Sequence, residues 1–134
     1  KGVELSLRWD PDPRVKVFSD LTYQNAESPV SAEPLRNLPE WMGSVRVGFQ
    51  PIEPLKVRVE LSFASESFDV QIAVPDMTLV DGYGLLDLAA SWDLNTAWKI
   101  LARVDNLTDT DYEHFIGFPL PGLTGKIGFS YTLR

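Results

Sequence analysis

The chain has 134 residues, of which 44% are hydrophobic and 23% charged, and this balance is typical of one folded domain rather than of a disordered chain. No run of about 18 apolar residues occurs, which excludes a transmembrane helix but leaves open a membrane β-barrel, whose strands are apolar only at alternate positions. The absence of cysteine excludes disulfides and thiolate metal sites, and the net charge of -7 argues against nucleic acid as a partner.

The first half of the chain alternates apolar and polar residues, which is the period-two pattern of β-strands. We expect four strands here, at residues 2–9, 15–23, 44–50 and 55–63. The fourth is the most regular, since five apolar residues from Leu55 to Phe63 alternate with charged or polar ones. Tight turns rich in proline, at 10–14 and 51–54, join these strands in pairs, and a long proline-rich connector at 25–41 separates the pairs.

The second half gives three more strands, at residues 84–94, 98–106 and 126–134. Asn95 and Thr96 form a short turn between the first two of them. The connector at 64–83 alternates from Phe68 to Val74, and we expect it to extend the preceding hairpin rather than add two strands, with Pro75-Asp76 at the centre of its turn. The chain is therefore predicted to be all-β, with seven antiparallel strands joined by short turns at one end and long connectors at the other.

The faces of these strands indicate which solvent each one meets. The polar face carries charges of both signs: Glu4, Arg8, Lys16, Arg46, Lys56, Arg58, Glu60, Asp87, Lys99, Arg103, Asp105 and Lys126. The aromatic residues gather at two heights: Trp9, Phe49, Trp92, Trp98 and Tyr131 near the short turns, and Tyr23, Phe63 and Tyr83 near the long connectors. Aromatic residues favour the two lipid–water interfaces, so this arrangement predicts two girdles of an up-and-down transmembrane β-barrel wall.

This interpretation fixes an orientation. Outer-membrane barrels keep short turns in the periplasm and long loops outside, so the connectors at 25–41, 64–83 and 106–122 are expected to be extracellular. Five aliphatic residues between the girdles are expected to face lipid: Val59, Leu61, Leu88, Ile100 and Ile127.

The end of the chain resembles the C-terminal signature of TonB-dependent outer-membrane receptors. The residues that carry this resemblance are Val104, Asn106, Leu107, Tyr112, Pro121, Gly122, Phe129 and Tyr131. Two earlier stretches resemble strand entries of the same family: Gly2-Val3-Glu4-Leu5, and Leu35 to Pro39 followed by Gly43. The resemblance covers most of the chain and identifies it as similar to the C-terminal third of the family's barrel.

The resemblance implies a function and a set of partners. The family imports iron–siderophore complexes, cobalamin or similar nutrients through a plugged barrel of about 22 strands in the outer membrane of Gram-negative bacteria. Residues 1–134 would form one partial barrel domain, which contains no plug domain and binds no cofactor. Its partners would be outer-membrane lipid, the remaining strands of the barrel and the plug of the full receptor. TonB would act only through that plug. The residues expected to touch ligand lie in the extracellular loops: Trp41, Tyr112, His114, Phe115 and Phe118.

No pattern of catalytic residues points to an enzyme. His114 is the only histidine and lies beside Asp109, Asp111 and Glu113, but the supporting ligands of a metal site and the glycine of a calcium loop are missing. No phosphate loop, nucleophile elbow or zinc-protease motif occurs. We therefore expect no catalytic residue and no metal site, and we expect His114 to be a solvated loop residue.

The strand count sets the last expectation. Seven strands leave two unpaired edges, and hydrocarbon cannot satisfy their backbone groups. No signal-peptide pattern precedes the first strand, so we expect a mature chain or a fragment, completed by upstream strands, by a second copy or by residues 68–74 folding back. Two alternatives stay open: a small autonomous outer-membrane barrel with a structural or adhesion role, and a soluble β-barrel that binds an apolar ligand.

Overall fold

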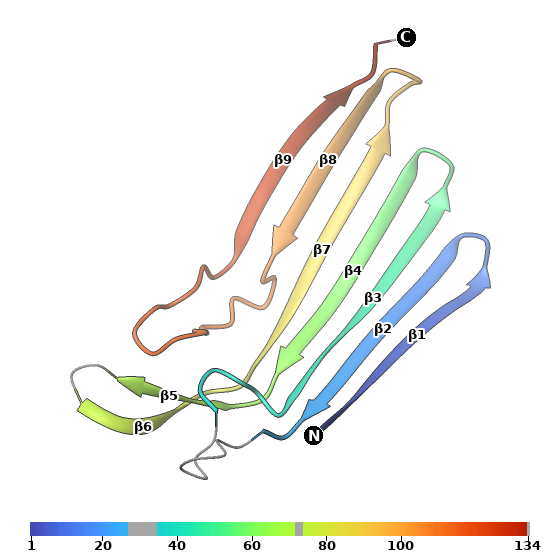
Figure 1. The fold of residues 1–134 in the computed structure, drawn as a ribbon. Coiled ribbons are helices and arrows are strands. Elements are labelled where there is room, and N and C mark those ends of the chain that lie inside the picture. The colour runs from blue at the N-terminus through green and yellow to red at the C-terminus, as the bar shows by residue number, and fades with distance from the viewer. Residues whose placement is uncertain (27–34, 72–73, 134) are drawn as a thin grey trace.

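The computed structural model describes residues 1–26, 35–71 and 74–133. The nine strands of this part are β1 (Gly2–Asp12), β2 (Val15–Gln24), β3 (Trp41–Ile52), β4 (Leu55–Ala64), β5 (Ser67–Gln71), β6 (Val74–Val80), β7 (Tyr83–Asp93), β8 (Trp98–Asp105) and β9 (Thr124–Tyr131). Seven of them form one antiparallel sheet in the order β1-β2-β3-β4-β7-β8-β9, and β5 and β6 form a separate hairpin (Figure 1). No helix of the described residues is long and apolar enough to cross a membrane.

The register of the sheet places like residues side by side. One transverse row runs across six strands through apolar residues alone: Trp9, Val17, Val47, Val59, Leu88 and Val104. The row beside it contains charged residues, and in it Arg46 lies directly opposite Glu60. Because a slip of one residue would exchange the two faces of a strand, these rows fix the register of the sheet.

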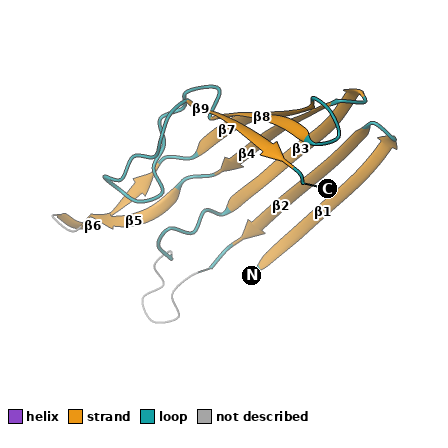
Figure 2. Ribbon diagram, turned by 90° about the horizontal axis from the view of Figure 1, so that it is seen from above, coloured by secondary structure: helices purple, strands orange, loops and turns teal. Residues whose placement is uncertain are grey.

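The sheet is a single curved layer (Figure 2), and nothing in the described part of the chain covers its apolar face. Among the described residues Val80 is the only buried apolar one, and it lies in the β5–β6 hairpin rather than in the seven-stranded sheet. Side chains of the apolar face are exposed, among them Val59 (39%), Leu61 (49%) and Ile127 (77%). A soluble barrel or sandwich buries this face, so the sheet needs an apolar surrounding from elsewhere.

The seven predicted strands are confirmed, with differences at their ends. β3 begins at Trp41 rather than at residue 44, because its ladder with β2 continues to the pair Tyr23–Trp41. β9 begins at Thr124 and ends at Tyr131, so Leu133 is outside the strand.

The prediction for residues 64–83 was wrong in two respects. The ladder between β4 and β7 ends at the pair Ala64–Tyr83, and β5 and β6 form two further strands in a sheet of their own. Pro75 and Asp76 lie inside β6 rather than at the centre of a turn. Alternation alone did not reveal this break, because the hairpin keeps the same period as the sheet that it leaves.

The two outer strands of the sheet are β1 and β9, and they do not pair with each other. The β5–β6 hairpin does not close this gap, since its strands pair with one another. The idea that residues 68–74 fold back onto an open edge is therefore wrong.

Candidate functional site

The three long connectors meet at one end of the sheet, around the β5–β6 hairpin. Arg36, in the connector between β2 and β3, forms a parallel bridge with Phe68 of β5. The backbone N–H of Asn37 donates to the carbonyl oxygen of Phe68 over 2.7 Å. The first connector is thus attached to the second by backbone hydrogen bonds.

Asp69 joins the third connector to the other two. One carboxylate oxygen accepts the backbone N–H of Val70 at 2.7 Å and the side-chain amide of Asn37 at 3.4 Å. The other oxygen accepts the backbone N–H of Ile116 at 3.1 Å. These bonds hold the pKa of Asp69 below its ordinary value. The bond from Ile116 lowers the pKa most and the bond from Val70 comes second, and the charge of Arg36 adds to the effect.

Asn106 organises the base of the connector between β8 and β9. It is 3% exposed and has a φ of 51°. Its side-chain oxygen accepts the backbone N–H of Thr110 at 2.9 Å, and its amide donates to the carbonyls of Thr110 at 2.8 Å and Pro121 at 3.5 Å. Its own N–H donates to Asp87 of β7 at 2.9 Å. One side chain therefore binds both arms of the loop together.

A second bond closes the same loop. The carboxylate of Asp109 accepts the backbone N–H of Leu123 at 2.8 Å, and Asp109 also has a left-handed backbone with a φ of 51°. A Cβ atom at Gly122 would collide with this carboxylate. Any larger residue at position 122 would therefore require the Asp109 carboxylate to move.

Two of the predicted ligand contacts lie together. The ring of Tyr112 is 4.8 Å from that of Tyr83 and 5.8 Å from that of His114. Nε2 of His114 lies 2.9 Å from the hydroxyl of Tyr83. Tyr83, which we assigned to an aromatic girdle, therefore also supports this loop cluster.

Phe115 and Phe118 lie on a small loop beyond that cluster. The loop is closed by the bridge between Glu113 and Pro119 and by a 3.0 Å bond from Phe118 N–H to the Phe115 carbonyl. Their side chains are 53% and 70% exposed. Trp41 lies apart from them, with its ring 4.6 Å from that of Tyr23. The structure thus brings Tyr112 and His114 into one cluster, places the two phenylalanines on an adjacent tip, and leaves Trp41 in an aromatic pair of its own.

The remaining aromatic residues of the two predicted girdles lie on the sheet. Near the short turns, Trp98 and Tyr131 face each other across β8 and β9 with rings 4.7 Å apart. Trp9, Phe49, Trp92 and Phe63 are exposed. Their contact with lipid stays a prediction.

The described residues contain no group of three or more histidine, cysteine, aspartate or glutamate side chains that could hold a metal ion. His114 is the only histidine, and its Nε2 is occupied by Tyr83. That His114 does not bind a metal ion stays a prediction.

The polar face of the sheet carries a network of ion pairs. Arg46 binds Glu60 across β3 and β4, with Nε 2.9 Å from the carboxylate. Arg103 binds Asp105 on its own strand and Asp87 on β7, and Lys126 binds Asp105 at 2.9 Å. A sheet with such a face opposite an uncovered apolar face is the expected wall of a membrane barrel.

The family model named TonB dependent receptor-like, beta-barrel matches residues 1–107. The chain belongs to this family. Its sheet is accordingly an antiparallel up-and-down wall segment of a transmembrane β-barrel, as the resemblance implied.

Solved TonB-dependent receptors share the fold of the segment at low sequence identity. The siderophore receptor PirA from Acinetobacter baumannii matches with a TM-score of 0.84 and 14% identity, over 97% of this chain and 21% of the receptor. The ferric-catecholate import receptor Fiu from E. coli K12 matches with a TM-score of 0.81 and 20% identity, over 97% of this chain and 20% of the receptor. The ferripyoverdine receptor of Pseudomonas aeruginosa matches with a TM-score of 0.82 and 17% identity, over 97% of this chain and 19% of the receptor. The chain thus spans about a fifth of the receptors that it matches.

Two residues of this end were missed or misjudged from the sequence. Asp69 was not singled out, although an acidic residue in an apolar alternation is a visible signal. Asn106 was noted only as part of a family signature, whereas its burial and its bonds make it the centre of the loop. Its partners are loop backbone groups, which no periodicity could have indicated.

Proposed function

We propose that the chain forms part of the wall and three extracellular loops of an outer-membrane receptor that imports a scarce nutrient, such as an iron–siderophore complex or cobalamin, with energy from TonB. The observation that carries this proposal is the single-layered sheet, apolar and uncovered on one face and ion-paired on the other. In a bilayer the first face meets lipid and the second lines an aqueous lumen. The names of the structural relatives, which are siderophore receptors, support the substrate class.

The open edges of the sheet fit the same proposal. The outer strands β1 and β9 present backbone groups that hydrocarbon cannot satisfy, so each needs a neighbouring strand. A larger barrel supplies such strands on both sides. The segment would then contribute its loops to the extracellular opening of the barrel, together with the loops of the other strands.

The loop end would contribute contacts to the ligand. Phe115 and Phe118 project on a tip that is anchored by Asp69 through Ile116. Exposed aromatic side chains on an anchored loop provide apolar contact area without a large ordering cost. Tyr112 and His114, at the foot of the same tip, would add polar groups.

The test measures uptake by the whole protein in the outer membrane of a Gram-negative host. Labelled ferric siderophores and cobalamin are supplied to cells with and without TonB, and one of them should accumulate only when TonB is present. The double variant Phe115→Ala, Phe118→Ala should weaken binding of that nutrient by about tenfold or more, which corresponds to at least 1.4 kcal/mol.

The control variant is Phe129→Ala, which removes an equally exposed ring from the outer face of β9. It should leave nutrient binding unchanged. Uptake that does not need TonB would contradict the proposed function, and equal binding by the loop variant and the control would contradict the role of the loop.

A further inference from the structure

The β5–β6 hairpin is bound to both of the other extracellular connectors. Phe68 of β5 pairs with Arg36 and accepts the N–H of Asn37, which attaches the first connector. Asp69, the next residue, accepts the N–H of Ile116, which attaches the third. The hairpin is not part of the seven-stranded sheet, since its two strands pair with each other. It therefore joins two loops that leave the wall at different places, one after β2 and the other after β8.

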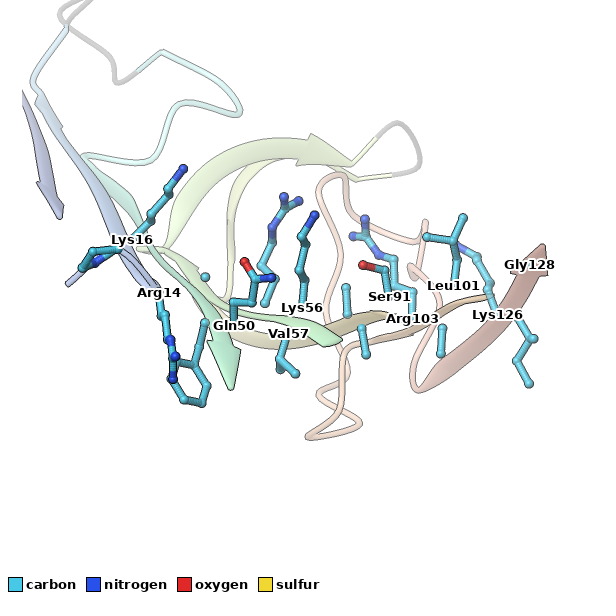
Figure 3. Close-up of a pocket in the computed structure, with 18 residues that line it drawn as sticks. Arg14, Lys16, Gln50, Lys56, Val57, Ser91, Leu101, Arg103, Lys126 and Gly128 are labelled. Carbon is cyan, nitrogen blue, oxygen red and sulfur yellow. The ribbon is translucent and has the colours of Figure 1, made fainter. Parts of the chain in front are cut away.

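The hairpin stands on the polar side of the wall. In Figure 3 its pale green ribbon lies on the side to which Lys56 and Arg103 extend, whereas Val57 points to the opposite side. Val57 belongs to the apolar face, in one row with Phe49. In the proposed receptor that face meets lipid and the polar side meets the lumen. A loop that is bound to the hairpin is thus held above the lumen rather than above the surrounding lipid.

The backbone of each attached loop is shaped for its bond to the hairpin. Asn37 and Gly117, which lie at the two attachment points, have left-handed backbones with φ of 53° and 80°. Glycine adopts this conformation freely, and asparagine tolerates it better than most residues. Gly117 also donates its N–H to the carboxylate of Glu113 at 2.5 Å, so the aromatic tip is bound to its own stem as well. Each loop thereby presents a fixed N–H to the hairpin.

We propose that the three connectors form one preassembled unit in the ligand-free protein, and that Asp69 is the positioning residue that fixes the aromatic tip within it. The inference deepens the proposed function and rests on it, since the tip is the part expected to touch the nutrient. The carboxylate of Asp69 is occupied by N–H donors, so it acts through the tip rather than by touching the nutrient.

The bonds that join the unit lie between described residues of this segment, so they do not require a neighbouring strand of a larger barrel. The first and third connectors share no hydrogen bond in the described ranges, and each is bound to the hairpin between them. A change within the third connector should therefore be felt in the first, and the effect should pass through Asp69.

Amide hydrogen exchange of the whole ligand-free protein in lipid vesicles tests the unit, because residues that open together share one opening equilibrium. The N–H of Asn37 reports on the first connector, and that of Ile116 reports on the third. Their protection factors should agree to within about threefold. Glu113→Ala removes a bond inside the third connector, and it should increase exchange at Asn37 by about threefold or more.

Two variants show whether this effect passes through Asp69. In the background Asp69→Ala, where exchange at Asn37 is already faster, Glu113→Ala should cause no further increase. The control is Asp111→Ala, which removes an exposed carboxylate from the same connector. Asp111 makes no hydrogen bond or ion pair within the described part of the chain, so exchange at Asn37 should not change.

The positioning role is measured with the labelled nutrient that the cells accumulate. Asp69→Asn should weaken binding of that nutrient by about threefold or more, because the tip loses its attachment through Ile116. In the double variant Phe115→Ala, Phe118→Ala, the same change should cause no further loss, since no rings remain to be placed. A role of Asp69 outside the tip would instead weaken binding equally in both proteins.

The outcomes separate the inference from the proposed function. Exchange at Asn37 that does not respond to Glu113→Ala, or a response that persists without Asp69, would overturn the preassembled unit. Equal losses of affinity with and without the two rings would overturn the positioning role. If no nutrient accumulates, the proposed function fails and the positioning role fails with it, whereas the exchange results still decide whether the three connectors form one unit.

Discussion

The two ends of the sheet are built in different ways. At the turn end, side chains bind backbone groups only two or three residues away. Asp12 accepts the N–H of Arg14 at 2.8 Å, and Asn95 accepts those of Ala97 and Trp98 at 2.9 and 3.0 Å. At the loop end, local bonds are joined by remote ones, since Asp69 and Ile116 are 47 residues apart in the chain.

The two ends of the sheet therefore differ in which residues stabilise them. A turn between neighbouring strands is stabilised by its own residues, so the turn end forms wherever the strands pair. The loop end forms only after three separate connectors have come together, and a few side chains hold them there. Single substitutions should therefore do more damage at the loop end than at the turn end.

Asn106→Ala should give the largest effect. The change removes the bonds to Thr110 and Pro121, leaves the half-buried Thr110 N–H without its partner, and places alanine at a φ of 51°. We expect the free energy of unfolding to fall by about 3–5 kcal/mol. Urea titration of the whole protein in lipid vesicles, followed by tryptophan fluorescence, measures this loss.

Asn95→Ala is the matched change at the turn end. Its two hydrogen bonds are exposed and local, and water can replace them. The loss should be about 1 kcal/mol. Equal losses at positions 95 and 106 would remove the proposed difference between the two ends.

Val59→Arg should follow in size. Val59 lies in the apolar row at the middle of β4, 39% exposed and without protein cover in the described residues. Arginine at the bilayer midplane costs about 2–4 kcal/mol. Ser62→Arg on the polar face of the same strand should cost much less, because it meets water. An unfolding free energy that falls equally for both variants would contradict the assignment of the two faces.

The sequence predicted the wall much better than the loop end, and the two ends explain why. Period-two alternation reports the face of each residue, so β4 and β7 were located to within about two residues. It does not report where a ladder stops, and Pro75-Asp76 was therefore assigned to a turn although both lie in β6. The bonds of Asp69 join loops whose approach depends on the whole sheet.

The charged face of the sheet shows the same limit on the wall itself. The sequence showed that charges of both signs share the polar face. It did not show that Lys16, Arg58 and Arg103 fall in one row, because that depends on the register between strands two apart. The register thus carries information on charge placement that alternation within single strands lacks.

Gly122→Ala should have a moderate effect. The added methyl group would collide with the carboxylate of Asp109, which must then move away from the N–H of Leu123. We expect a loss of about 1–2 kcal/mol in the free energy of unfolding. A double-mutant cycle with Asp109→Ala identifies the cause, because the cost of Gly122→Ala should largely vanish in that background. Additive losses would show that the glycine is needed for another reason.

The smallest expected effect concerns the pH dependence of the loop anchor at Asp69. Hydrogen bonds from Ile116 and Val70 hold the pKa of this carboxyl below its ordinary value of about 3.9. A depressed pKa in the folded state means that the anchor is fully present above the ordinary value and is lost as the pH falls through the lower, folded one. Near neutral pH the loops should therefore be held together, and strong acid should release them.

Amide hydrogen exchange at Ile116 measures this release directly. The N–H of Phe118 is the internal reference, because it donates to Phe115 in the same loop and not to a carboxylate. Exchange at Ile116 relative to Phe118 should be slow at neutral pH and should accelerate only below the ordinary carboxyl range. In Asp69→Asn the relative exchange should already be fast at neutral pH and should not change with acid. A wild-type ratio that is constant down to strong acid would show that Asp69 does not hold the third loop, and the long-range bond that most separates this end of the sheet from the other would lose its role.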